Sequence, residues 1–170
     1  MTVDPGRLEA LLPRLRPGHY EITSPAEDGY NCLAWAHGDS TREWWPGDVP
    51  GYYWPVDVDP GFDESVGAFV TELEKIGWTP CPDSGVEPGQ IKMVLYARAD
   101  GFVQHAARQV ENGWASKIGT LEDIVHATAR DAGGGTYGEP VAYLRRGTPP
   151  VIPWPPVLPT GGAPGGPRGR

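Results

Sequence analysis

The chain has 170 residues, with 14 basic and 22 acidic side chains and a formal net charge of −8. This length supports one domain, and the negative charge disfavours a nucleic-acid backbone or an anionic membrane as the main partner. Hydrophobic residues make up 39% of the chain, enough for one core, yet no apolar run approaches the ~20 residues of a membrane-spanning helix.

The start of the chain lacks the basic and apolar regions of a signal peptide. The two cysteines do not make a disulfide framework. We therefore expect a cytoplasmic location, where thiols stay reduced.

The first third of the chain is predicted to hold two short helices and a loop. Residues 7–15 carry leucines at the spacing of an amphipathic helix, which Pro13 should end early. Residues 30–37 form a short apolar run for which Asn31 is a plausible N-cap. Residues 44–60, rich in Trp, Pro and Gly, are predicted to be a loop rather than regular structure.

The clearest helix is predicted over residues 63–76. Asp63 or Ser65 can cap its start, and its apolar residues recur along one face. Gly77 provides its end.

After this helix the spacing of the apolar residues becomes that of strands. Residues 91–97 are predicted to form a strand buried on both faces, and residues 102–110 a second strand. Asn112-Gly113 is a strong type I′ hairpin signal that leads into a third strand over residues 114–118.

The last folded part is predicted to be a helix over residues 120–130 and an edge strand over residues 140–144. Helices followed by an antiparallel meander indicate an α+β fold rather than a parallel doubly wound sheet. We expect short N-terminal helices packed on a small antiparallel sheet, in one domain spanning residues 1–146.

The C-terminal segment has a different composition. Residues 147–170 contain 8 Pro and 6 Gly. The first part favours polyproline II and the last part is Gly-rich, so we expect a disordered tail. Residues 149–156 could dock on an aromatic groove of a protein partner.

Cys32 is the first candidate for chemistry, because it falls in the first turn of the predicted 30–37 helix. At that position the backbone N–H groups and the helix dipole favour a thiolate over a thiol. A small cysteine beside Leu33 and Ala34 can equally fill core volume. The position by itself leaves both interpretations open.

His105 is the second candidate, on the predicted 102–110 strand. A two-residue turn at Asn112-Gly113 places Thr120 opposite His105, with Ser116 on the same face of the hairpin. An imidazole among small and apolar residues needs a polar partner. It could serve as the base for a nucleophilic cysteine, or it could be a satisfied core histidine.

Further residues could complete such a site. Asp123 is the nearby carboxylate suited to orient an imidazolium. Asn31 is a donor near the cysteine, although it is equally explained as a cap. The substrate-binding set is predicted to be Asn31, Trp44, Trp45, Ser116 and Lys117. The tryptophans could frame a cleft or simply pack, and Lys117 could bind an anionic group or simply face solvent.

A metal site would have to use Cys32, His37 and Cys81 with His105 or His126. The spacing of the first two matches neither CxxC nor HExxH, so this interpretation is disfavoured and we expect no metal and no cofactor. His126 is better explained as a helix residue that pairs with Glu122.

Two stretches of the chain resemble a known family. The first is the segment Asn31-Cys32-Leu33-Ala34-Trp35-Ala36 followed by Trp44-Trp45-Pro46. The second runs from His105-Ala106-Ala107-Arg108-Gln109 through Trp114 to Ser116-Lys117-Ile118-Gly119. Over residues 20–145 this NCxAWA…WWP…HAARQ…WxSKxG pattern resembles a family of small bacterial proteins described as a domain of unknown function.

More distantly, a cysteine on a helix followed by a histidine on a hairpin is similar to the papain-like peptidases and amidases of the NlpC type. That resemblance implies Cys32 as nucleophile and His105 as base. This sequence departs from the NlpC pattern because no His, Asn or Asp falls cleanly one strand after His105.

Two functions follow as hypotheses. The first is a thiol-dependent hydrolase or acyltransferase that acts on an amide or ester bond of a peptide-like or small-molecule substrate. The second is a non-catalytic binding protein that uses the Trp-rich loop or the Pro-rich tail.

Overall fold

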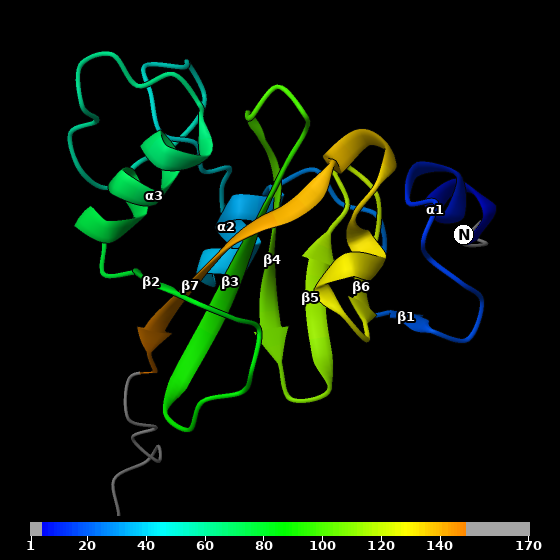
Figure 1. Ribbon diagram of the computed structural model, residues 1–170. Helices are drawn as coiled ribbons and strands as arrows, with labels where there is room; N and C mark the ends of the chain where they lie inside the picture. Colours follow the sequence, from blue (N-terminus) through cyan, green and yellow to red (C-terminus); the bar gives the residue numbers. More distant parts are fainter. Residues whose placement is uncertain (1–4, 149–170) are drawn as a thin grey trace, which may run out of the picture.

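The computed structural model describes residues 5–148 and has an α+β fold built on one antiparallel sheet (Figure 1). Seven strands lie in the order β1-β6-β5-β4-β3-β7-β2. Their bounds are β1 Tyr20–Ile22, β2 Thr79–Cys81, β3 Gln90–Ala97, β4 Val103–Val110, β5 Gly113–Lys117, β6 Asp123–His126 and β7 Glu139–Gly147.

Three short α-helices and two 3₁₀ turns accompany the sheet. They are α1 Pro5–Leu11, α2 Cys32–His37, α3 Val66–Lys75, η1 Ala129–Ala132 and η2 Gly135–Tyr137. The predicted helices in the first half are confirmed, including the early end of α1 before Pro13. None of the helices within residues 5–148 is long and apolar enough to cross a membrane.

The two faces of the sheet are covered by different elements. α2 and α3 supply Leu33, Phe69 and Leu73 to a core on one face, together with Leu95 and Ala106 of the sheet. The opposite face packs in two clusters, one with Leu8 of α1 and the two leucines that follow the helix, Leu12 and Leu15, and one with the alanines of η1. Because both faces are covered, β3 is buried on both sides over most of its length, as predicted for residues 91–97.

The hairpin between β4 and β5 has a different register from the predicted one. Val110 pairs with Gly113, so the turn is Glu111-Asn112 and the pairing is shifted by two residues. A type I′ turn needs positive φ at both turn residues, and within residues 5–148 Glu64 is the one non-glycine residue with positive φ. An even shift keeps every side chain on its face, so His105 and Ser116 still share one.

The predicted helix over residues 120–130 is wrong. Residues 123–126 form β6, which pairs with β5 on one side and β1 on the other, and η1 follows it. The β-branched pair Ile124-Val125 suits a strand between two neighbours. Hydrogen bonding to a neighbouring strand on each side stabilises the strand more than the acidic residues at its start would stabilise a helix.

The predicted edge strand over residues 140–144 lies inside the sheet, where β7 runs between β3 and β2. Pro140 is tolerated there because the pairing with β3 shifts register beside it, between Leu95 and Tyr96. Proline has no N–H to donate to a neighbouring strand. Where the pairing is irregular a hydrogen bond is already absent, so proline destabilises the sheet least there. The predicted tail, residues 147–170, begins too early, because Gly147 belongs to β7 and the N–H of Thr148 donates to the carbonyl of Gly89. Residues 149–170 lie outside the described residues.

Candidate active site

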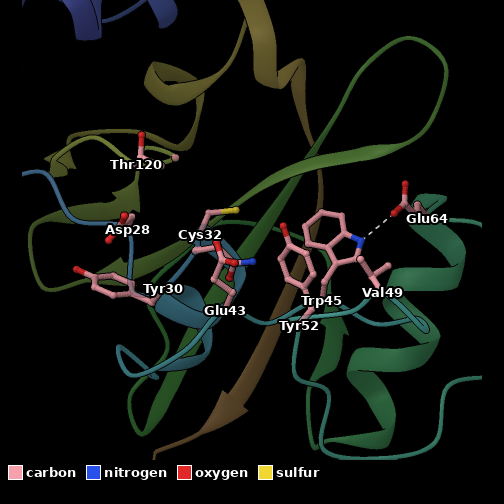
Figure 2. A pocket seen from close by; sticks show the side chains of 11 residues that line it. Asp28, Tyr30, Cys32, Glu43, Trp45, Val49, Tyr52, Glu64 and Thr120 are labelled. Carbon is pink, nitrogen blue, oxygen red and sulfur yellow. Dashed lines mark hydrogen bonds between the residues drawn. The ribbon is translucent and has the colours of Figure 1, made fainter.

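A cleft of about 420 Å³ opens beside the start of α2. Cys32 lies between two groups of side chains (Figure 2). One group is Asp28, Tyr30 and Thr120, and the other is Trp45, Tyr52 and Glu64. The remaining lining residues are Asn31, Glu43, Val49 and Gly119. The cleft is therefore assembled from the segment before α2, the Trp-rich loop, the residue before the α3 cap and the connection from β5 to β6.

The local sequence fixes Cys32 at the first position of α2. The side chain of Asn31 accepts a hydrogen bond from the N–H of Ala34 at 3.0 Å and so caps the helix. Leu33 and Ala34 are buried against the sheet, which leaves the half-buried Cys32 at the side that borders the cleft. The predicted helix position of the thiol is confirmed.

The charge state of Cys32 differs from the expected thiolate. Burial raises the pKa of the Cys32 thiol to about 11, although the N–H groups of Ala106, Leu33 and Cys32 itself act on the sulfur and lower that pKa. The carboxylate of Glu43 raises it further. Desolvation outweighs the N–H groups, and the resting group at neutral pH is a thiol.

His105 is buried, with 1% of its surface exposed, and is held by its neighbours. Its ring stacks on Tyr137 at a centroid distance of 4.1 Å, and its Nε2 lies 3.1 Å from the hydroxyl of Ser116. Burial lowers the pKa of His105 to about 3, and the nearby His126 adds to the effect. The imidazole is therefore neutral at physiological pH.

A chain of hydrogen bonds assigns the tautomer of His105. The Nδ1 of His126 lies 2.8 Å from the carbonyl of Thr128, which can only accept, so Nδ1 carries the proton. Its Nε2 then accepts from the Ser116 hydroxyl at 2.9 Å, and Ser116 in turn accepts from Nε2–H of His105. This leaves His105 Nδ1 as a buried lone pair, and no partner for it lies within residues 5–148.

The structure brings the Cys32 sulfur next to the backbone of His105. The sulfur faces the N–H of Ala106, the following residue, and a charge on Cys32 would raise the pKa of Tyr137, which stacks on the imidazole. β4 pairs with β5 only from Arg108 to the turn, so β4 has no partner on that side at His105 and Ala106. Within residues 5–148 no hydrogen bond joins the thiol and the imidazole. α2, which carries Cys32, covers one face of the sheet, and the His105 side chain points to the other face, against Tyr96 and Tyr137.

Asp123 does not orient His105. Its Oδ2 accepts from the Tyr30 hydroxyl at 2.6 Å, and its Oδ1 lies 3.9 Å from Lys117 Nζ, on the opposite face of the sheet. The orienting group is Ser116, which is fully buried and bonded to both histidines rather than free to bind substrate. The alternation of side chains along a strand separates Ser116 from Asp123.

Two other predicted substrate-binding residues are inaccessible. Lys117 is fully buried, donates to the carbonyls of Glu27 and Leu121, and lies over the ring of Tyr30. Trp44 is buried and stacks on His37 at 4.4 Å. Both side chains therefore support the fold instead of meeting a ligand.

Asn31 and Trp45 do border the cleft. The amide of Asn31 donates to the carbonyl of Trp44 at 2.7 Å and accepts from its N–H at 3.2 Å, so it ties the loop to α2. Trp45 donates from Nε1 to Glu64 at 2.8 Å and packs edge-on against Phe69. Trp45 is thus a fixed wall of the cleft.

Sequence reasoning missed the carboxylates of the cleft and the role of His126. Glu43 precedes the predicted loop, Glu64 lies at the start of the predicted 63–76 helix, and nothing in their spacing relates them to Cys32. The positive φ of Glu64, 61°, is a backbone signal of a constrained site that only the structure reveals. Within residues 5–148 no three His, Cys, Asp or Glu side chains are arranged to hold a metal ion.

Comparison with known protein families gives a match over most of the chain. A family model described as a domain of unknown function, DUF7689, covers residues 21–145. Searches of curated proteins and of solved structures found no match. The matched region contains α2, the Trp-rich loop, α3 and the sheet from β2 to β6. The chain therefore belongs to the DUF7689 family, whose function is unknown.

Proposed function

We propose that the protein is a cysteine hydrolase or acyltransferase of papain-like type that acts on an amide or ester bond. The observation that carries the proposal is the free Nδ1 of His105. This buried nitrogen has no hydrogen-bond partner within residues 5–148. An unsatisfied buried polar atom lowers the stability of the fold, so its presence calls for an explanation, and a catalytic role is one. The Cys32 sulfur lies at the peptide group that follows this histidine and borders an open cleft.

In the acylation step the Cys32 sulfur attacks the carbonyl carbon, and its proton moves to His105 Nδ1. The new carbon–sulfur bond forms as the amine or alcohol leaves, and His105 returns the proton to that leaving group. The product is a thioester on Cys32. Water in a hydrolase, or a second nucleophile in an acyltransferase, then attacks the thioester and restores the thiol.

The environment of the pair favours proton transfer during attack over a resting ion pair. Both groups are neutral, because burial raises the pKa of Cys32 to about 11 and lowers the pKa of His105 to about 3. Ser116 and His126 hold the imidazole in the tautomer that can accept a proton at Nδ1. Cys32 lies on the α2 face of the sheet and the His105 side chain on the other face, so the proton has to cross the sheet where β4 and β5 are not paired. We propose that one water at this opening relays the proton from the thiol to His105 Nδ1 when substrate binds.

The negative oxygen that forms during attack also needs donors. The N–H groups of Ala106, Leu33 and Cys32 act on the sulfur, and we propose that donors of this group stabilise the negative oxygen that forms beside it. Asn31 is engaged with Trp44 and with the helix start, so it is not required for this role.

The test is acylation of Cys32 by p-nitrophenyl acetate, followed by mass spectrometry, in a Cys81→Ser background. We expect an acetyl group on Cys32, and a rate lowered by about 100-fold to 10,000-fold in His105→Ala, which loses the base. His19→Ala, at an exposed site, is the control and should retain the rate.

The pH profile separates general-base catalysis from simple thiolate chemistry. With His105 in place the acylation rate should stay level from about pH 5 to 9, because the imidazole is unprotonated throughout. In His105→Ala the rate should rise tenfold per pH unit. An unchanged rate in folded His105→Ala, or equal acylation of Cys32 and Cys81 in the parent chain, would overturn the proposal.

A further inference from the structure

We propose that the cleft selects substrates carrying an organic cation, such as a protonated amine or a quaternary ammonium, close to the bond that reacts. This inference names the substrate class of the site described above and rests on the proposed function. It is carried by the charges and the aromatic rings of the cleft walls.

The charged side chains that line the cleft are all acidic. They are Asp28, Glu43 and Glu64, and no lysine or arginine lines it. Within residues 5–148 none of the three forms an ion pair. The charge of Asp28 is partly balanced by Lys117, which is buried behind Tyr30, so the charges of Glu43 and Glu64 are the ones left for a ligand to neutralise.

Two cations close to cleft-lining residues, Lys117 and Arg42, are engaged elsewhere in the protein. Lys117 lies under Tyr30, but it is fully buried and bonded to two backbone carbonyls. Arg42 lies over the ring of Tyr53, 3.8 Å from its centroid, and pairs with Asp39. Neither is among the residues that line the cleft, so an incoming cation meets no positive side chain on its walls.

The walls also present aromatic faces. Trp45 is held by its hydrogen bond to Glu64 and by Phe69, and Tyr52, with 40% of its surface exposed, lies beside it (Figure 2). Tyr30 lies on the other side of Cys32. Aromatic rings together with carboxylates attract a cation, and most strongly one that is weakly hydrated.

A bound cation would also act on the nucleophile. The charge of Glu43 reaches the Cys32 sulfur and disfavours its ionisation. A positive group placed between them would cancel that repulsion and favour the thiolate as attack begins. The substrate would thereby assist its own reaction, and a neutral analogue would not.

The experiment measures the modification rate of Cys32, in a Cys81→Ser background, by three methanethiosulfonates that differ in charge. The probes are the trimethylammonioethyl, the methyl and the sulfonatoethyl reagents, each of which leaves a disulfide on the thiol and releases a sulfinate. Rates at pH 8 are divided by those of free 2-mercaptoethanol, which removes the intrinsic reactivity of each reagent.

We expect the normalised rate to be highest for the cationic reagent and lowest for the anionic one. Glu43→Gln and Glu64→Gln should each reduce the cation-to-anion ratio about threefold to tenfold, and 0.5 M salt should reduce it as well. Glu74→Gln on α3 removes the same charge from an exposed site that does not line the cleft, and should leave the ratio unchanged.

The outcomes distinguish this inference from the proposed function. If Cys32 reacts with the neutral reagent but shows no preference for the cation, or prefers the anion, the substrate class is wrong while the nucleophile stands. If Cys32 reacts with none of the reagents in the folded protein, Cys32 is not an accessible nucleophile. The proposed function and the inferred substrate class are then both wrong.

Discussion

Tyr30, Asp123 and Lys117 form a buried polar cluster beneath the candidate active site. The Tyr30 hydroxyl donates to Asp123 at 2.6 Å, and burial together with that carboxylate raises the pKa of Tyr30 to about 12. The positive charge of Lys117 is stabilised mainly by hydrogen bonds to two backbone carbonyls, and Asp123 Oδ1 lies 3.9 Å from its Nζ. Buried charges of this kind require all their partners, so the cluster fixes the segment that leads into Cys32.

Removal of one hydroxyl from this cluster should be costly. We expect Tyr30→Phe to lower the free energy of unfolding by about 1–3 kcal/mol, because Asp123 loses its short donor and its other oxygen already lacks a hydrogen-bond partner within residues 5–148. Urea unfolding monitored by tryptophan fluorescence measures this change. Tyr52→Phe, at an exposed ring of the same cleft, should change it by less than about 0.5 kcal/mol. Equal effects of the two substitutions would contradict the role of the cluster.

At the scale of elements, α2 and the Trp-rich loop behave as one unit because Asn31 bonds to both. The same oxygen accepts from Ala34 and from Trp44, while the amide nitrogen donates to the Trp44 carbonyl. The side chain that positions the nucleophile therefore also positions the wall formed by Trp45.

Asn31→Ala and Asn31→Asp should separate these contacts. The alanine variant loses the cap and both loop contacts, and we expect a loss of about 1–2 kcal/mol in the free energy of unfolding. The aspartate variant keeps an acceptor for the N–H groups of Ala34 and Trp44. Hydrogen exchange should therefore speed up at both amides in the alanine variant and stay slow in the aspartate variant. Identical exchange in the two variants would show that Asn31 does not act as the link.

The elements that sequence reasoning located correctly are those determined by near neighbours. α2 and α3 have side-chain caps and an apolar face within their own residues, and β3 is a continuous apolar run. β6 was missed because its structure depends on strands from residues 20–22 and 113–117. Gly113 shows how tight that pairing is, since an added Cβ would lie 2.3 Å from the carbonyl oxygen of His126.

At the scale of the whole molecule, folding keeps three histidines neutral. Burial lowers the pKa of His37 to about 4 and of His105 to about 3, and it also lowers the pKa of His126. An unfolded histidine has a pKa of about 6.5. Between these values the unfolded chain binds more protons than the folded chain, so the protein loses stability as the pH falls.

The acid sensitivity can be measured by urea unfolding between pH 7 and 5. Below about pH 6.5 each buried histidine should remove about 1 kcal/mol per pH unit from the free energy of unfolding. His37→Asn should make this dependence less steep by about that amount. His19→Asn, at an exposed residue, should leave it unchanged. If His37→Asn and the parent chain lose stability equally, the folded pKa of His37 is not lowered.

The sequence by itself determined the local features: the Asn31 cap, the position of Cys32 at a helix start, the face of the hairpin that carries His105 and Ser116, and the α+β class. These depend on alternation and capping, which act over a few residues. Only the tertiary structure decided which polar groups meet. It joined His105 to Ser116 and His126, assigned Asp123 and Lys117 to the other face, and brought Glu43 and Glu64 to the cleft. Pairings between distant strands and loops depend on the packing of the whole domain, and desolvation in that packing makes the predicted thiolate a thiol.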